Sequence, residues 1–331
     1  MNILITGHTG FIGCHLTPAL VAKNHFITGI SRHIEPDLAD TQLRQIQISS
    51  LEQYTDWHQA LIGVDTVIHL AARAHILDDS VEDPAAEFFR VNTKGTINLV
   101  QAAIKAEVKH FIFISSIGAI TTLSRDILTE TATCQPDTAY GASKLAAETA
   151  LIDLCQNTPM SWTIIRPTLV YGPGNPGNMQ RLLKLVSSHL PLPLGSIDNQ
   201  RSFLYIGNLI NAMITCLDHP NAKNQIFLLS DGQNISTPAL IRHLACFLNT
   251  RSILLPIPVP LLRLFGKITG KSSALDRLME SLVVSNEKIA TTLNWQPPYS
   301  IEQGLAATAK WYKSANSWSS YVSWLFKAVW K

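Results

Sequence analysis

Short apolar runs alternate with amphipathic stretches along the first half of the chain. The apolar runs predict strands near residues 2–6, 26–30, 66–70, 111–115 and 162–165, and the stretches between them have helical spacing. This alternation is typical of a parallel sheet that is covered by helices on both faces. We therefore predict an α/β fold for residues 1–171, built on a doubly wound parallel sheet of the Rossmann type.

The pattern becomes irregular after Arg166. Residues 172–200 are rich in glycine and proline, as is expected of loops around a ligand. No apolar run reaches the roughly 20 residues that a membrane-spanning helix requires. The closest run, Ile253 to Phe265, contains three prolines and Arg263, and it predicts an extended arm that enters a helix.

Composition limits the possible partners. The chain has 331 residues, of which 46% are hydrophobic, so it can fill a sizeable core. Its 26 basic and 24 acidic side chains leave a net charge of +2, which argues against nucleic acid as a partner. The five scattered cysteines suggest neither a disulfide framework nor a metal site. Met1 leads almost directly into the first predicted strand and leaves no room for a signal peptide, so we expect a cytoplasmic protein.

A glycine-rich turn follows the first predicted strand and opens a helix predicted from Phe11 to Ala22. Gly7 permits a tight turn, Gly10 lets the backbone approach a pyrophosphate, and Gly13 lets the helix pack closely on the strand. The free N–H groups at the start of the helix would face the phosphates. The sequence therefore predicts a dinucleotide site that includes Thr9, Phe11 and Ile12.

Tyr140 and Lys144 are four residues apart in a predicted helix, so their side chains share one face. An ammonium beside a phenol favours the phenolate and lowers a pKa that is normally about 10. The pair therefore predicts a general acid/base that works near neutral pH.

Several stretches in the same order resemble the extended short-chain dehydrogenase/reductases, specifically the NAD-dependent epimerase/dehydratase family that acts on nucleotide sugars. The stretches are residues 6–13, 67–72, 91–96, 113–116, 140–144 and 166–174. The resemblance implies a smaller, interleaved C-terminal substrate lobe of residues 172–200 and 235–313. It also implies that residues 201–234, with strands near 203–206 and 226–229, rejoin the first lobe. We further expect a homodimer.

The resemblance assigns roles to individual residues. Ser116 matches the serine that completes the catalytic group with Tyr140 and Lys144. The implied cofactor contacts, besides the glycine turn, Tyr140 and Lys144, are Ser31, Arg32, Leu70, Ala71, Ala72, Arg73, Asn92, Ser115 and Pro167. The implied substrate contacts are Ser116, Asn178, Met179, Arg201 and Arg277.

Two positions depart from the family pattern. Ser31 and Arg32 follow the second strand, where NAD-bound epimerases usually have an aspartate for the ribose 2′-hydroxyl, and Arg32 could pair with a 2′-phosphate. NADP(H) is therefore favoured over NAD(H). Ile117 and Gly118 follow Ser116, where 4,6-dehydratases have an acidic pair, which argues against dehydration.

Within the family, the stretches 69–79, 193–202 and 229–232 are similar to the branch that reduces UDP-4-keto-6-deoxy-N-acetylglucosamine for surface polysaccharide. A 4-ketoreductase is the favoured prediction. A 4-epimerase of a UDP-hexose or UDP-N-acetylhexosamine, with tightly bound NAD, is the alternative. A non-catalytic dinucleotide-sensing protein is a remote alternative, because such a protein has no need of the acid/base pair.

Residues 314–331 form a tryptophan-rich tail. Trp318, Tyr321, Leu325 and Phe326 share one face of a predicted helix. We expect this helix to dock on the protein or on a second subunit, in preference to lying in a membrane interface.

Overall fold

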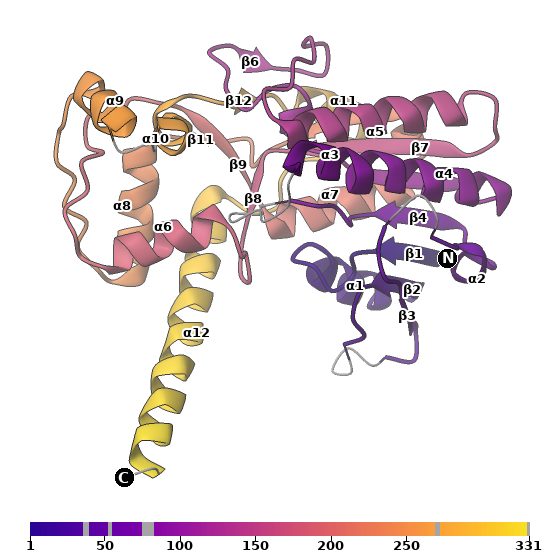
Figure 1. The fold of residues 1–331 in the computed structure, drawn as a ribbon, viewed down its shortest axis with the longest axis horizontal. Coiled ribbons are helices and arrows are strands. Elements are labelled where there is room, and N and C mark those ends of the chain that lie inside the picture. Colours follow the sequence, from indigo (N-terminus) through magenta and orange to yellow (C-terminus); the bar gives the residue numbers. More distant parts are fainter. Residues whose placement is uncertain (36–39, 52–54, 75–82, 269–271, 330–331) are drawn as a thin grey trace.

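The computed structural model describes residues 1–35, 40–51, 55–74, 83–268 and 272–329, and the side chains of 272–274, 277 and 316–329 lie outside this description. The chain forms two adjacent lobes and a long C-terminal helix (Figure 1). The larger lobe contains the first strands of the chain. The smaller lobe is built from later segments.

The larger lobe is built on a seven-stranded sheet with the order β10-β7-β5-β4-β1-β2-β3. Its strands are β1 (Asn2–Thr6), β2 (Phe26–Ser31), β3 (Leu43–Gln47), β4 (Thr66–His69), β5 (His110–Ile114), β7 (Ser161–Pro167) and β10 (Gln225–Leu229). All pairings between them are parallel. The predicted doubly wound Rossmann-type sheet is confirmed, and the strand order reverses between β1 and β4.

Helices cover both faces of this sheet (Figure 1). Alternate residues of β1 point to opposite sides, so that Ile3 and Ile5 pack in one core cluster and Leu4 packs in the other. The first cluster is covered by α1 (Gly13–Val21) and α7 (Ile206–Asp218), and the second by α4 (Gly95–Lys105) and α5 (Ala139–Cys155). This sandwich fixes the carboxyl edge of the sheet, where ligands bind in such folds.

The remaining elements of the larger lobe are short. They are α2 (His58–Leu61), α3 (Pro84–Phe88), the π-helical turn η2 (Phe89–Lys94), the 3₁₀ turns η3 (Ile117–Ala119) and η4 (Pro220–Ala222), and α11 (Glu287–Leu293). Strand β6 (Ile127–Leu128) pairs with β12 (Val283–Val284). The sequence prediction missed β3, because only Leu43 and Ile46 of its five residues are apolar and their spacing of three does not fit the alternation of a strand.

The smaller lobe has its own sheet and core. Strands β8 (Leu169–Tyr171), β9 (Arg201–Tyr205) and β11 (Asn234–Ile235) form a three-stranded sheet. Helices α6 (Asn178–Ser187), α8 (Thr237–Leu248), α9 (Val259–Ile268) and α10 (Ser272–Met279) pack around it. The expected strand near 203–206 is therefore β9 of this second sheet, whereas the expected strand near 226–229 is β10 and pairs with β7.

Asp231 holds the two lobes together. Its carboxylate accepts hydrogen bonds from Tyr171 Oη at 3.0 Å, from Asn208 Nδ2 at 2.7 Å and from the Tyr205 backbone N–H at 2.7 Å. Burial raises the pKa of Asp231 to about 6, although these three hydrogen bonds oppose the shift. Asn208 Nδ2 also donates to the Tyr299 carbonyl at 2.9 Å, so the network joins α7 to the segment before α12.

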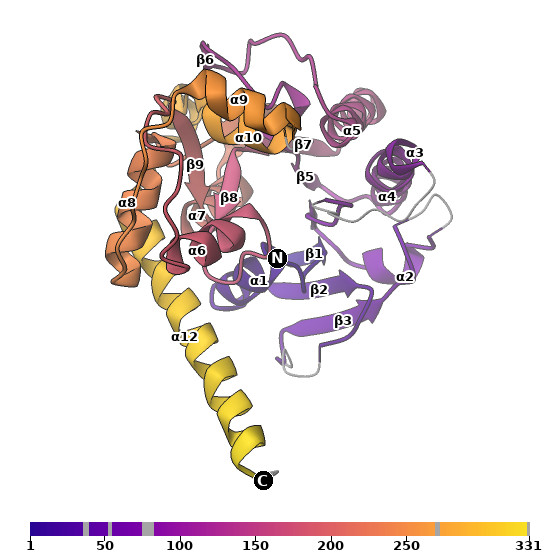
Figure 2. The ribbon, with the colours of Figure 1, turned by 60° about the vertical axis from the view of Figure 1, so that its left-hand side comes forward.

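Helix α12 (Ile301–Val329) begins in the core of the smaller lobe and continues as one helix. Its second half leads away from the rest of the chain in both views (Figures 1 and 2). The first turns of α12 pack in the smaller lobe, whereas docking of residues 314–331 on the protein or on a second subunit stays a prediction. In the part of the chain that the structure describes, no helix is long and apolar enough to cross a membrane.

Candidate active site

The glycine turn at the end of β1 has the geometry that a dinucleotide requires. Gly7 has a φ of +73°, and a Cβ on Gly13 would lie 2.3 Å from the Gly7 carbonyl oxygen. Only glycine fits both conditions, so the turn and the close packing of α1 depend on these two residues. Gly10 is exposed at the tip of the turn.

The start of α1 is open to an anion. Its N-cap residue, Ile12, makes no side-chain capping hydrogen bond, and the first turn has no acidic residue. The unpaired N–H groups of a helix N-terminus bind phosphate well. Thr9 and Phe11 are partly buried in the same turn, and the Phe11 ring packs edge-to-face on His15 with centroids 5.7 Å apart. The residues present therefore fit a pyrophosphate.

Tyr140 and Ser116 lie together at the carboxyl edge of the sheet. Ser116 follows β5 and caps η3, where its Oγ accepts the Gly118 N–H at 3.0 Å. Burial raises the pKa of Tyr140 to about 12, and its side-chain hydrogen bond with Ser116 opposes part of this shift. At neutral pH the phenol is therefore protonated and already bonded to the predicted catalytic serine.

Lys144 shares the face of α5 with Tyr140, as predicted, but its ammonium is directed elsewhere. Nζ donates to the Ile114 carbonyl at 2.8 Å and lies 4.6 Å from the centre of the Phe113 ring. Burial lowers the pKa of Lys144 to about 7, and the Glu148 carboxylate opposes this shift. The predicted lowering of the Tyr140 pKa is therefore replaced by a rise, because burial of the phenol dominates.

A buried ion pair lies one turn beyond Lys144. Arg166 Nη2 donates to Glu148 Oε2 at 2.5 Å, and Arg166 Nε donates to Glu148 Oε1 at 3.0 Å. Both side chains are nearly inaccessible to solvent. The pair ties α5 to β7 directly before Pro167, which is buried at the end of that strand.

Asn92 holds the other side of α5. Its Oδ1 accepts the Arg73 N–H at 2.7 Å, and its Nδ2 donates to Ser143 Oγ at 3.0 Å. Thr93 Oγ1 also donates to the Ser143 carbonyl at 2.8 Å. Asn92, predicted as a cofactor contact, thus fixes α5 and the loop after β4, while its contact with a cofactor stays a prediction.

The loop after β4 crosses the glycine turn. Ala71 approaches within 3.1 Å of the position that a Cβ on Gly7 would occupy, and its N–H donates to Thr6 Oγ1 at 3.2 Å. Leu70 N–H donates to the Thr6 carbonyl at 3.3 Å, so Leu70 and Ala71 lie along this edge, and Ala72 follows them partly buried. Arg73 lies over the Phe88 ring, 5.7 Å from its centre. Residues 75–79 of the family-like stretch lie outside the described residues.

Two buried hydroxyl groups lie beside the site without a hydrogen-bond partner among the described residues. They are Ser115 Oγ, after β5, and Thr168 Oγ1, after Pro167. Buried polar atoms are normally paired, so an unpaired one at a strand end suggests that a ligand supplies the partner. This observation fits the predicted contact of Ser115 with a cofactor.

The residues predicted to determine the preference between NADP(H) and NAD(H) lie at the end of β2. Ser31 is buried and its Oγ donates to the His33 carbonyl, whereas the Arg32 side chain is exposed. No acidic side chain follows β2 at these two positions.

The predicted substrate contacts come from the smaller lobe. Asn178 is exposed and Met179 is buried at the start of α6, and Arg201 begins β9. Arg201 Nη1 donates to the Glu280 carbonyl at 3.0 Å, which fixes the direction of this side chain. Arg277 is on α10, but its side chain lies outside the described residues.

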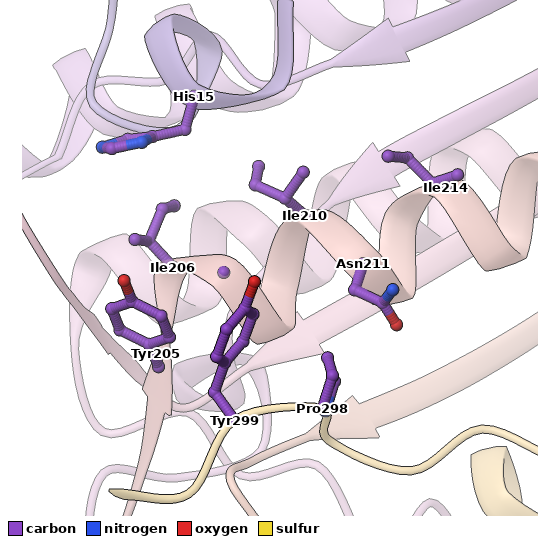
Figure 3. Close-up of a pocket in the computed structure, with 9 residues that line it drawn as sticks. His15, Tyr205, Ile206, Ile210, Asn211, Ile214, Pro298 and Tyr299 are labelled. Carbon is purple, nitrogen blue, oxygen red and sulfur yellow. The ribbon is translucent and has the colours of Figure 1, made fainter. Parts of the chain in front are cut away.

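A separate pocket of about 350 Å³ lies between α1, α7 and the loop before α12. His15, Ile206 and Ile210 line it together with the two phenol groups of Tyr205 and Tyr299 (Figure 3). None of Ser116, Tyr140 and Lys144 lines this pocket. It is therefore distinct from the candidate acid/base site.

The fold and this site place the protein in the class of dinucleotide-dependent oxidoreductases. Residues 3–229 match the model of the NAD dependent epimerase/dehydratase family. The chain therefore belongs to that family, the extended short-chain dehydrogenase/reductases that act on nucleotide sugars.

Individual relatives extend over nearly the whole chain. It is 41% identical over 320 residues to a UDP-glucose 4-epimerase of Vibrio cholerae, which covers 96% of this chain and 97% of the relative. It is 29% identical over 325 residues to an N-acetyl-α-D-glucosaminyl-diphospho-ditrans,octacis-undecaprenol 4-epimerase of Escherichia coli O157:H7, with 94% and 95% covered. The fold matches that of a UDP-glucuronic acid 4-epimerase from Bacillus cereus, solved in complex with NAD, with a TM-score of 0.78, 22% identity, and 95% and 99% of the chains covered.

Sequence reasoning assigned no role to Glu148. A signal was present, since Tyr140, Lys144 and Glu148 follow one another at intervals of four residues and so form one stripe along α5. Arg166 was part of a matching stretch, but nothing in the sequence pairs it with a residue 18 positions earlier.

Proposed function

We propose that this protein is a 4-epimerase of a UDP-sugar. The observation that carries the proposal is the hydrogen-bonded pair of Ser116 and Tyr140, with Lys144 on the same helix face, at the sheet edge beside an open glycine turn. The similarity to the Vibrio cholerae UDP-glucose 4-epimerase over nearly the full length supports it. Ile117 and Gly118 offer no carboxyl group for the elimination of water.

The cofactor in this proposal is NAD, as in the family model. The nicotinamide accepts and returns hydride when it is bound. Gly7, Gly10 and the first turn of α1 would hold the pyrophosphate, and Lys144 would reach the nicotinamide ribose hydroxyls. Ser115 lies at the strand end where such a group would meet it.

The residues of the chain move and hold the proton. Tyr140 accepts the proton of the sugar C4 hydroxyl during oxidation and returns it to the same oxygen during reduction. Ser116 donates a hydrogen bond to that oxygen and so keeps it within reach of the phenol. With a pKa of about 12 the phenol of Tyr140 is protonated at neutral pH and carries the proton that reduction needs, and the charged form of Lys144 would favour the phenolate that oxidation requires.

The sugar diphosphate is the part of the substrate that the relatives share. The Vibrio cholerae protein is named for UDP-glucose, and the Escherichia coli protein is named for a sugar diphosphate on undecaprenol. Arg201 would bind this diphosphate, because a guanidinium matches two phosphate oxygens at once. Asn178 and Met179 would lie beneath the nucleotide.

A 4-ketoreductase that uses NADPH is the second candidate. It is favoured by Ser31 and Arg32, because the exposed guanidinium of Arg32 could pair with a 2′-phosphate and no carboxylate is present for a 2′-hydroxyl. The same Ser116, Tyr140 and Lys144 would then reduce a 4-keto sugar once in each turnover.

Analysis of the cofactor that stays with the purified protein separates the two candidates. We expect denaturation to release NAD, and we expect the untreated protein to interconvert UDP-glucose and UDP-galactose, or the corresponding N-acetyl sugars, without added cofactor. Protein that releases no dinucleotide and oxidises NADPH with a UDP-4-keto sugar would instead establish the reductase. Replacing Arg32 with Asn should then lower the preference for NADPH, whereas it should change little in an NAD-dependent epimerase.

A further inference from the structure

Helix α9 carries an apolar stripe that faces solvent. Leu261, Leu264, Phe265 and Ile268 are 55, 54, 61 and 75% exposed. Their spacing of three, four and seven residues from the first places them on one side of the helix. The opposite side packs on the smaller lobe through Leu262 and Gly266, which are buried.

The helix therefore has one apolar side in the core and a second apolar side at the surface. Single exposed apolar residues are ordinary on protein surfaces, but four large ones on two turns of one helix form a patch. Contiguous patches of this kind mark surfaces that meet another apolar phase. The helix is at the outer end of the smaller lobe, so a flat surface can reach it (Figure 1).

The charged side chains on α9 itself are basic. Arg263 and Lys267 are both exposed, and the helix has no acidic residue. Arg263 Nη2 donates to Glu280 Oε1 at 2.6 Å, so Lys267 supplies the charge on α9 that this carboxylate does not offset.

We propose that the exposed face of α9 docks in the interface of an anionic membrane. An apolar stripe flanked by lysine and arginine is the pattern of helices that lie in the headgroup region. Anionic lipid complements the basic flanks, and acyl chains cover Leu261, Leu264 and Ile268. This surface is defined by α9 alone and does not depend on which sugar the enzyme converts.

The proposed surface is continuous with the site. The Glu280 carboxylate accepts a hydrogen bond from Arg263 of α9. The Glu280 carbonyl accepts a hydrogen bond from Nη1 of Arg201, the predicted diphosphate ligand. Docking of α9 would therefore bring the diphosphate end of the site close to the membrane surface. The end of α12 lies on the opposite side of the molecule in both views (Figures 1 and 2), so the tail is not part of this surface.

Sedimentation of the full chain with vesicles tests the proposal. We expect binding to vesicles that contain about a quarter phosphatidylglycerol and much weaker binding to pure phosphatidylcholine. The double variant Leu261→Glu/Leu264→Glu should lower the partition coefficient by about tenfold or more, since it places charge on the apolar stripe. Ile62→Glu, at a position that is 62% exposed in the larger lobe, is the matched control and should leave binding unchanged.

Two further variants complete the test. Lys267→Glu leaves the apolar stripe intact and should weaken binding to the anionic vesicles alone. This single variant keeps the proposal testable if the double variant fails to fold. Deletion of residues 316–331 should leave binding intact. Loss of binding on that deletion, with binding retained by the double variant, would overturn the proposal in favour of the tail. Absence of vesicle binding, or a double variant that only splits an oligomer, would also overturn it.

Discussion

Arg166 and Glu148 form a bidentate ion pair inside the protein, with donor to acceptor distances of 2.5 and 3.0 Å. Glu148 is one helical turn from Lys144, and Arg166 directly precedes Pro167. The pair therefore connects the helix that carries the acid/base residues to the strand end that borders the site. Removing one partner leaves an uncompensated charge in the interior.

Glu148→Gln should accordingly destabilise the protein by about 3–5 kcal/mol, as the loss of one partner of a buried ion pair usually does. It should also lower the pKa of Lys144 further, because the carboxylate of Glu148 is the group that raises it. Urea denaturation measures the first effect. Lys109→Gln, which breaks an exposed pair with Asp65, is the control and should cost no more than about 1 kcal/mol. Equal effects of the two variants would show that the buried pair is not important for stability.

Tyr140→Phe should lower turnover by about a hundredfold or more, because it removes the proton that passes to and from the sugar oxygen. Cofactor affinity should change little, since the ring and its packing on Phe88 remain. Steady-state kinetics and a cofactor titration give the two quantities. Lys144→Ala should impair both, which distinguishes the two residues. Near-normal turnover of the phenylalanine variant would remove Tyr140 from the mechanism.

Gly141→Ala tests how closely α5 must approach η3. A Cβ at Gly141 would lie 2.0 Å from the Gly118 carbonyl oxygen, so the helix has to move away and separate Tyr140 from Ser116. We expect a loss of about tenfold or more in turnover and of about 1–3 kcal/mol in stability. Gly63→Ala is the control, because a Cβ there would meet no atom within 4 Å while the backbone φ of +70° makes the change costly for stability, and it should leave turnover unchanged. Normal kinetics in the Gly141 variant would show that this close approach is dispensable.

Acid should unfold the protein partly through His69. Burial lowers the pKa of His69 from 6.5 to about 3, so the unfolded chain binds more protons than the folded chain at mildly acidic pH. The contribution of His69 to stability is complete above about pH 6.5 and should fall by about 2 kcal/mol between pH 7 and 5. Urea denaturation at pH 7 and at pH 5 measures how far the free energy of unfolding falls, and this fall should be smaller in His69→Gln by the contribution of His69. His33→Gln, at an exposed position, is the control and should show the same fall as the parent protein.

The parts of the fold that follow from local rules could be predicted from the sequence. Gly7 and Gly13 occupy positions that a side chain cannot, and the buried strands are apolar along their length. Edge strand β3 was missed because its two apolar residues, Leu43 and Ile46, lie on opposite faces and give no alternating pattern. The direction of Lys144 and the raised pKa of Tyr140 depend on the Ile114 carbonyl, the Phe113 ring and the depth of burial, which only the assembled fold determines. The pairing of Glu148 with Arg166 likewise needs the sheet that brings α5 onto β7.

The hydrogen bonds around Asp231 determine how the molecule can move. Tyr171, Asn208 and the Tyr205 backbone all meet one carboxylate, and Tyr171 Oη also lies 3.3 Å from the Ile301 carbonyl at the start of α12. A hinge between the lobes would have to break several of these bonds together inside the protein. We therefore expect the lobes to behave as one rigid frame. Entry and release of a substrate would then proceed without rotation of one lobe against the other.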